Sequence, residues 1–206
     1  MEKITAFSIK YGFLIVMGGS YLFFGLAQPA FWSWSNMFSI LLGVTVYAIL
    51  AMGITFTLVI DGLDLSVGAV AAMSVMIASY TMVVMDLGGV VAFIVCLLLG
   101  ALLGLINGLL IVRIKIPDLL ATLGMMFLIQ GLQLIPSGGR SIGTGMMLEN
   151  GEEAEGMFSE GFLYLGQGRL FGMVPIPVIF MIVMAIIVYL ILDHTRWGRV
   201  LYAIGG

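Results

Sequence analysis

Charge is scarce in this chain of 206 residues. Charged residues make up 9% of it and apolar residues 62%, whereas a soluble domain carries about 25% charged residues. This composition excludes an ordinary soluble domain and indicates a membrane protein whose solvent is the lipid bilayer. The net charge of −3 gives no basic surface for nucleic acid, so we expect no nucleic acid partner.

Cysteine and histidine are nearly absent. Cys96 is the only cysteine, so no disulfide forms within the chain, and its apolar surroundings favour a buried structural thiol. His194 is the only histidine, which excludes a multi-histidine metal site. The sequence also has no phosphate-binding loop and no Ser/His/Asp set that the topology brings together. We therefore expect no catalytic residues, no cofactor and no metal.

Long apolar runs fill the sequence instead. A membrane-spanning helix needs about 20 mostly apolar residues, and six segments approach or exceed that length. We predict an all-α, polytopic transmembrane helix bundle, with residues 1–206 forming a single domain. The predicted spans are Tyr11 to Ala27, Met37 to Ile60, Val67 to Met85, Val90 to Val112, Leu119 to Pro136 and Pro177 to Leu192.

The basic residues predict the topology, because lysine and arginine are enriched in cytoplasmic loops. With a cytoplasmic N-terminus, the outer segments hold only Arg140 and Arg169. The inner segments hold the other six, namely Lys3, Lys10, Arg113, Lys115, Arg196 and Arg199. We expect a multi-pass protein of the bacterial plasma (inner) membrane. The first run is long for a signal peptide, which favours a retained helix.

The longest polar stretch, residues 137–176, is predicted to be an extracytoplasmic loop. Its acidic centre, from Glu149 to Glu155, is typical of a mobile, solvated loop; a metal site built from these carboxylates is the weaker interpretation. Residues 161–170 are apolar enough to lie on the membrane surface or to pack on the bundle.

Two acids, Asp61 and Asp64, interrupt the apolar sequence between the second and third runs. A charge at bilayer depth costs about 2.5–3.5 kcal/mol, so these acids lie at a membrane surface or have a function within it. The topology places them at the inner ends of two helices. There Asp64 is expected as a helix N-cap or turn residue ahead of Val67, and Gly62 permits the chain reversal.

A few polar residues lie within the apolar runs. Asn107 adjoins a helix face with a glycine every four positions over residues 100–108, which is typical of close helix packing. Its first interpretation is an interhelical hydrogen bond, and its second is a substrate contact. Thr122, Gln130 and Gln133 interrupt the fifth run, and polar groups inside a membrane face the bundle or a wet cavity. For these three, a substrate path and interhelical bonding are equally open.

Four segments in order carry a family resemblance. They are residues 60–69, residues 99–108, residues 116–140 with Ser137-Gly138-Gly139-Arg140 at their end, and residues 195–206. The first resembles the Gly-Gly-Ile-Asp-Leu-Ser-Val-Gly signature of the sugar-type ABC importer permeases, the ribose, xylose and galactose permease family. The others resemble its fourth helix, its fifth helix and its cytoplasmic coupling segment. The residues of this signature turn in the chain are Asp61, Gly62, Asp64, Ser66 and Gly68.

The resemblance implies a permease subunit of an ATP-driven importer for a monosaccharide or similar small polar solute, acting by alternating access. It implies ABC ATPase subunits that hydrolyse the ATP, a periplasmic or extracellular solute-binding protein, and a second permease subunit, identical or different. It also implies that residues 193–206 begin the segment on which the ATPase docks. The residues implied in this coupling are Arg196, Gly198, Arg199, Gly205 and Gly206.

Two departures from the family pattern stand out. Asp61 replaces the first glycine of the signature, and the family continues with further membrane helices after the coupling segment, so this chain resembles a C-terminally truncated member. Two other functions stay open. One is a proton- or cation-coupled secondary transporter or channel that uses Asp61 and Asp64, and the other is a permease fragment that does not transport.

Overall fold

The computed structural model describes residues 2–148 and 150–206, with side chains from residue 11 onward. Helices carry most of the described chain, which confirms the all-α prediction. The α-helices are α1 (Glu2–Ala27), α2 (Trp34–Val59), α3 (Val67–Ser79), α4 (Gly89–Gly108), α5 (Asp118–Leu132), α6 (Glu160–Gln167), α7 (Ile176–His194) and α8 (Arg196–Gly205). A 3₁₀ turn, η1 (Pro29–Trp32), precedes α2, and π-helical turns η2 (Tyr80–Val84) and η3 (Leu109–Arg113) extend α3 and α4. Strand β1 (Arg169–Leu170) pairs antiparallel with β2 (Val174–Pro175).

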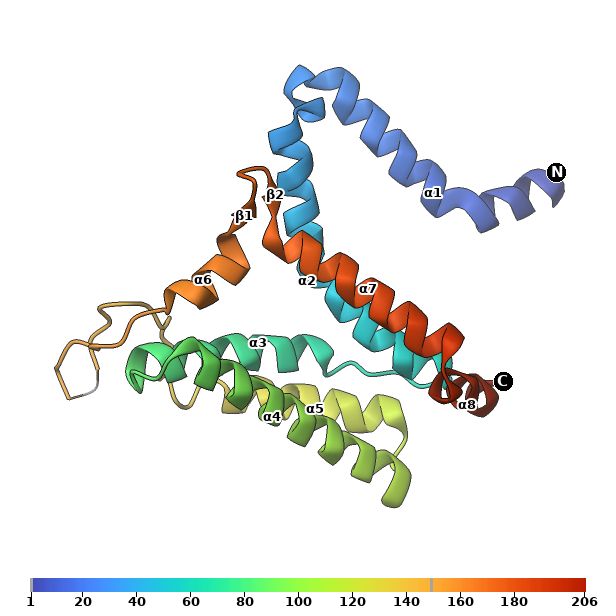
Figure 1. Ribbon diagram of the computed structural model, residues 1–206. Helices are drawn as coiled ribbons and strands as arrows, with labels where there is room; N and C mark the ends of the chain where they lie inside the picture. Colours follow the sequence, from blue (N-terminus) through green and yellow to red (C-terminus); the bar gives the residue numbers. More distant parts are fainter. Residues whose placement is uncertain (1, 149) are drawn as a thin grey trace.

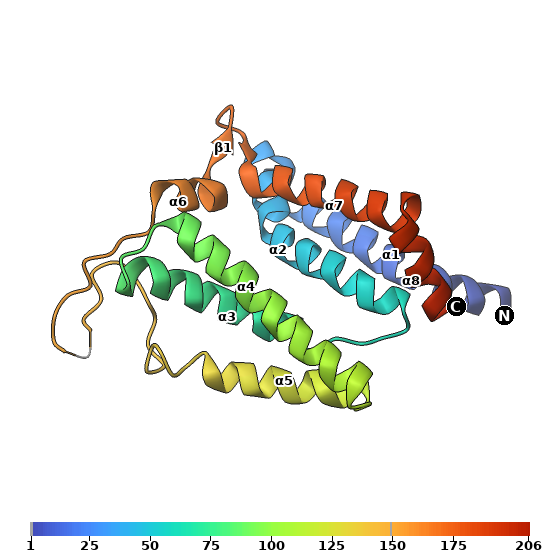
Figure 2. The same ribbon diagram turned by 60° about the horizontal axis from the view of Figure 1, so that its bottom comes forward.

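The helices form two groups rather than one closed bundle (Figure 1). In the first group α3 packs against α4 and α5, and in the second α2 and α7 lie side by side with α8 at their ends. Helix α6 connects the groups on one side, where it contacts α4 and α7. Helix α1 contacts η1 and diverges from α2, and Figure 2 shows the two groups from a second side.

All six predicted spans are helical. Four have the length and apolarity to cross a membrane, and they cover residues 34–59, 67–84, 89–113 and 176–194. The other two are shorter apolar helices over residues 11–27 and 118–132. Helix α5 ends at Leu132 rather than at the predicted Pro136, and the residues from Gln133 onward form turns.

Few described side chains are buried, and the buried ones lie mainly in the first group. One cluster joins α3, α4 and α5 through Ala69, Leu103, Met125 and Ile129. Large apolar side chains on α1, α2, α4 and α7 are exposed instead. The glycine face of α4 over residues 100–108, predicted to pack closely on another helix, is open: a Cβ added at any of its glycines would meet no atom within 4 Å. These faces need lipid or protein to cover them.

The segment predicted to be an extracytoplasmic loop, residues 137–176, contains hydrogen-bonded backbone structure. The Leu148 N–H donates to the Glu152 carbonyl oxygen at 2.8 Å, and the Ala154 N–H donates to the Met146 carbonyl oxygen at 2.8 Å. Residues 146–148 therefore pair with residues 152–154 as the two arms of a hairpin. Glu152 and Glu153 in the second arm and Glu155 just after it have exposed side chains, whereas Glu149 lies outside the described residues. Residues 161–170 are predicted to lie on the membrane surface or to pack on the bundle. Helix α6, which begins this segment, contacts α4 and α7 and therefore packs on the bundle.

Gly156 anchors this outer segment to the first helix group. A Cβ at Gly156 would overlap the carbonyl oxygen of Met82 and lie 2.5 Å from that of Val83, both in η2. The backbone of the outer segment therefore approaches η2 more closely than any larger residue permits.

We predict that Gly156→Ala lowers the thermal unfolding midpoint of the detergent-solubilised protein, because overpacking of this kind costs about 1–3 kcal/mol. Gly161→Ala is the matched control, since its Cβ meets no atom within 4 Å and alanine favours a helix. Equal midpoints for the two variants, measured by circular dichroism, contradict the close packing on η2.

Candidate functional site

Helix α2 ends in a cap formed by the first residues of the signature segment (residues 60–68). The Asp61 N–H donates to the Leu58 carbonyl oxygen at 3.1 Å, and the Gly62 N–H donates to that of Thr57 at 2.9 Å. These two bonds form a Schellman motif, in which the residue after the helix is left-handed and usually glycine. Asp61 has φ +59°, and aspartate is among the few residues that tolerate this conformation. Asp61 thus keeps the backbone conformation that the family's glycine favours.

Asp64 closes the turn before α3. Its Oδ1 accepts a hydrogen bond from the Ser66 N–H at 2.8 Å and another from the Ser66 hydroxyl at 2.6 Å. Helix α3 begins at Val67 with Ser66, not Asp64, at the N-cap position. The N-cap interpretation of Asp64 is therefore wrong, and its role as a turn residue is confirmed.

A buried polar contact ties the signature segment to α4. Asn107 Nδ2 donates to Ser66 Oγ at 2.9 Å, and the two residues are 6% and 1% exposed. This confirms the interhelical hydrogen bond predicted for Asn107. Its Oδ1 is buried and has no hydrogen-bond partner among the described residues. An unsatisfied buried group of this kind costs about 1–3 kcal/mol.

The same segment is tied to α5. The Leu63 N–H donates to Asp118 Oδ2 at 2.6 Å. The Thr122 hydroxyl donates to the Asp118 carbonyl oxygen at 2.8 Å and lies 3.5 Å from that of Leu63. The N–H groups of Leu63 and Leu119 hold the pKa of Asp118 below its usual range, because they stabilise the carboxylate. The sequence did not indicate this contact, because Leu63 and Asp118 are 55 residues apart.

The four residues of the predicted substrate path are not brought together. Asn107 and Thr122 lie at the ends of α4 and α5 that meet the signature segment. Gln130 and Gln133 lie at the other end of α5, where Gln130 is exposed and Gln133 is half-buried. Neither glutamine side chain has a hydrogen-bond partner in the part of the chain that the structure describes.

A cavity of about 470 Å³ lies at the end of the first helix group away from the signature segment, between η2 and the loop after α5. Its polar lining includes Tyr80, Ser137, Arg140 and Asn150. Arg140 Nη1 donates to the Met147 carbonyl oxygen at 3.3 Å. None of the four predicted substrate-path residues lines this cavity.

Two glycines hold α8 against the rest of the second group. A Cβ at Gly198 would overlap the carbonyl oxygen of Leu192 in α7, and a Cβ at Gly205 would overlap that of Val59 at the end of α2. Of the residues implied in ATPase coupling, Gly198 and Gly205 therefore determine how closely α8 packs.

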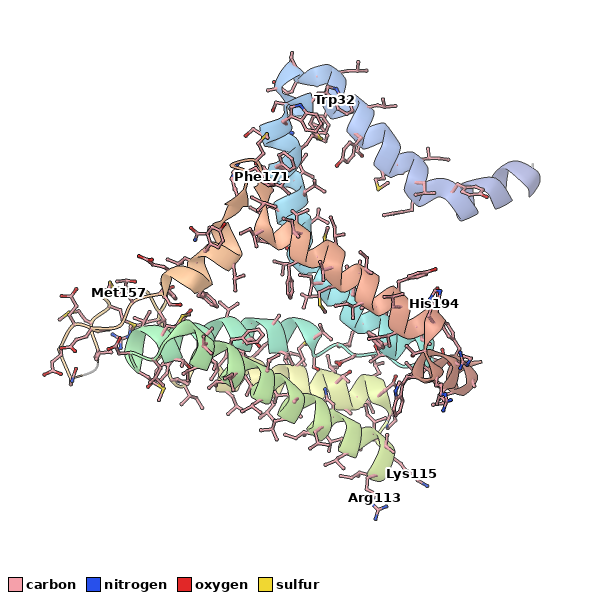
Figure 3. All side chains as sticks on the ribbon, in the orientation of Figure 1. Trp32, Arg113, Lys115, Met157, Phe171 and His194 are labelled. Carbon is pink, nitrogen blue, oxygen red and sulfur yellow. The ribbon has the colours of Figure 1, made fainter. Side chains whose placement is uncertain are left out.

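The remaining coupling residues are on the surface. Arg196, Arg199 and Gly206 are exposed. Helix α8 lies at the same end of the molecule as Arg113 and Lys115, opposite Trp32 and Met157 (Figure 3). The fold thus brings Arg113 and Lys115 to the same end as α8, which carries Arg196 and Arg199.

We predict that Asp61→Gly retains or raises the thermal unfolding midpoint, whereas Asp61→Val lowers it. The left-handed conformation costs an L-residue about 1–2 kcal/mol, and a β-branched residue adopts it least well. Leu65→Val, in the same segment but without a positive φ, is the control. A valine at position 61 that leaves the midpoint unchanged argues against the left-handed cap.

We also predict that Ser66→Ala destabilises the protein more than Asn107→Leu. The serine change leaves the buried Asn107 amide without its bond, at a cost of about 1–3 kcal/mol, whereas the leucine change removes the unsatisfied oxygen as well. The double variant should then recover part of the loss. Thermal midpoints in detergent measure all three, and a double variant less stable than Ser66→Ala contradicts the coupling.

Residues 36–206 match the family described as branched-chain amino acid transport system / permease component. The ribose import permease protein RbsC of Escherichia coli (strain K12) is 34% identical over 179 residues, which are 87% of this chain and 52% of that protein. RbsC of Bacillus subtilis (strain 168) is 35% identical over 206 residues, 100% of this chain and 58% of its own length.

A third relative is the D-allose transport system permease protein AlsC of Escherichia coli (strain K12), 30% identical over 202 residues, 96% of this chain and 56% of its own length. The chain thus spans about half the length of the curated relatives it matches. No solved structure matches it. The relatives confirm the resemblance to sugar permeases that the four segments indicated. The chain belongs to the family of branched-chain amino acid transport system permease components.

Proposed function

We propose that this chain is a membrane-spanning part of a permease subunit of an ABC importer, which carries a monosaccharide or similar small polar solute by alternating access. The observation that carries the proposal is the position of the signature segment. It lies between α8, the helix proposed to dock the ATPase, and α5, which carries Gln130 and Gln133. Gly205 of α8 packs on Val59, and four residues later Leu63 is bonded to Asp118 of α5.

Within this proposal the substrate path runs along α5 toward its outer end. The Gln130 and Gln133 amides can donate to and accept from solute hydroxyls. Polar groups at membrane depth face a wet cavity or a partner, which supports a solute-facing role for both. Asn107 and Thr122 contribute at the inner end by holding α4 and α5 to the signature segment.

The partners and orientation follow from the same arrangement. We place the N-terminus and α8 in the cytoplasm, because Arg113, Lys115, Arg196 and Arg199 gather at one end and basic residues favour that side. ABC ATPase subunits dock there and hydrolyse ATP outside this chain. The loop over residues 137–176 faces a solute-binding protein on the opposite side, and a second permease subunit covers exposed apolar helix faces.

Both acids of the signature segment have local structural roles. Asp61 adopts the left-handed cap of α2, and Asp64 accepts two hydrogen bonds from Ser66. The backbone conformation of Asp61 and the hydrogen bonds of Asp64 give both acids a structural role that needs no bound ion. This supports ATP-driven transport over proton- or cation-coupled transport.

The proposal is tested in bacterial cells that lack their own ribose permease and express this chain with a ribose ATPase and binding protein. We expect uptake of radiolabelled ribose that disappears when the ATPase is omitted. In the same cells Arg199→Glu should reduce co-purification of the ATPase several-fold, and Arg169→Glu, at the opposite end of the molecule, should leave it unchanged.

Uptake that continues without the ATPase and follows the pH gradient contradicts the proposal and supports a secondary transporter. Absence of both uptake and ATPase binding supports a permease fragment that does not transport. Equal ATPase recovery with the two arginine variants contradicts docking on α8.

A further inference from the structure

A short hairpin with an apolar tip precedes α7. Strands β1 and β2 pair Arg169 with Pro175 and Leu170 with Val174. At the tip the Met173 N–H donates to the Leu170 carbonyl oxygen at 3.2 Å. The two residues between them, Phe171 and Gly172, have φ +52° and φ +73°, and positive φ at both central residues is typical of a type I′ turn.

Phe171 is an unfavourable residue for its position in this turn. The first central residue of a type I′ turn is normally asparagine, aspartate or glycine, and a bulky residue at positive φ is a genuine outlier. Such strain costs about 1–3 kcal/mol. Packing within the described chain does not offset it, because the Phe171 side chain is 86% exposed.

The residues beside Phe171 extend the apolar tip. Met173 is 62% exposed and Leu170 is 42% exposed. Three large apolar side chains thus project from one tight turn. An exposed cluster at a strained position indicates an apolar surrounding outside this chain.

The position of the tip identifies that surrounding. Strand β2 leads directly into α7, a helix long and apolar enough to span the membrane. Two residues of extended chain cover about 7 Å. The headgroup region on each side of the hydrocarbon core is about 5–7 Å thick, so the tip lies at interfacial depth.

Aromatic residues of η1 and of the start of α2 mark the same end of the molecule. Phe171 lies toward the end that carries Trp32, opposite Arg113 and Lys115 (Figure 3). Trp32 and Trp34 are both exposed, as expected of tryptophans at a membrane–water interface. Arg169, exposed beside the tip, can keep its charged end among lipid headgroups.

We propose that Leu170, Phe171 and Met173 form a membrane anchor that inserts into the outer interface of the bilayer. Lipid provides the apolar contact that offsets the strain at Phe171. The anchor fixes the outer loop against the membrane next to the start of α7. It does not depend on which solute is carried or on whether the chain transports.

The test uses a spin label at position 171, introduced as Phe171→Cys in a Cys96→Ser background, with the protein in vesicles of phosphatidylethanolamine and phosphatidylglycerol. We expect the label to be more accessible to oxygen than to a water-soluble nickel complex. Glu155→Cys, exposed in the same outer loop, is the matched control and should show the reverse. Met173→Cys provides a second labelled position if the first variant does not fold.

A label at position 171 with the accessibility of the Glu155→Cys control overturns the proposal. Shielding that occurs only after a soluble binding protein is added also overturns it and identifies a protein contact instead. Phe171→Asn separates anchoring from packing. It should leave the thermal midpoint in detergent unchanged or higher, while shifting the Met173→Cys label toward water, and a lower midpoint contradicts the anchor.

Discussion

The structure depends on how one non-helical segment near the membrane satisfies its backbone. Residues 60–66 leave α2 and enter α3, and unsatisfied N–H and carbonyl groups are costly where water is scarce. One distant and one local side chain supply partners: the Asp118 carboxylate accepts from Leu63, 55 residues away, and the Asp64 carboxylate accepts from Ser66 within the segment. Because Ser66 in turn accepts from Asn107, one short segment holds α3, α4 and α5 at the end of α2.

This arrangement gives the proposed transport function a continuous physical path. Helix α8 rests on Val59 through Gly205, and the chain continues from Val59 through the left-handed cap to Leu63. Four residues of backbone therefore separate the contact of α8 on Val59 from the bond between Leu63 and the Asp118 side chain of α5. Arg196 and Arg199 are exposed on the face of α8 that does not pack on α2 and α7, where a partner can contact them.

Asp61 and Phe171 both adopt a left-handed backbone conformation, in different surroundings. Asp61 occupies a position that aspartate tolerates, and its strain is small because the Schellman bonds form around it. Phe171 occupies a similar conformation with a large, exposed apolar side chain. The first is explained within the chain, whereas the second requires an apolar surrounding outside it.

The sequence alone determined the helical character of the six apolar runs, because length and apolarity are local properties that select a membrane helix. It also determined the interhelical role of Asn107, since a buried amide needs a partner, and it carried the family resemblance in its motifs. The partner of Asp118 and the N-cap at Ser66 were not predictable in this way. Nor did the sequence predict that the glycine face of α4 is open or that Gly205 contacts Val59. The bond of Asp118 and the contact of Gly205 join residues far apart in the chain, and only the packing of the helices in three dimensions decides which residues meet and which helix faces stay open.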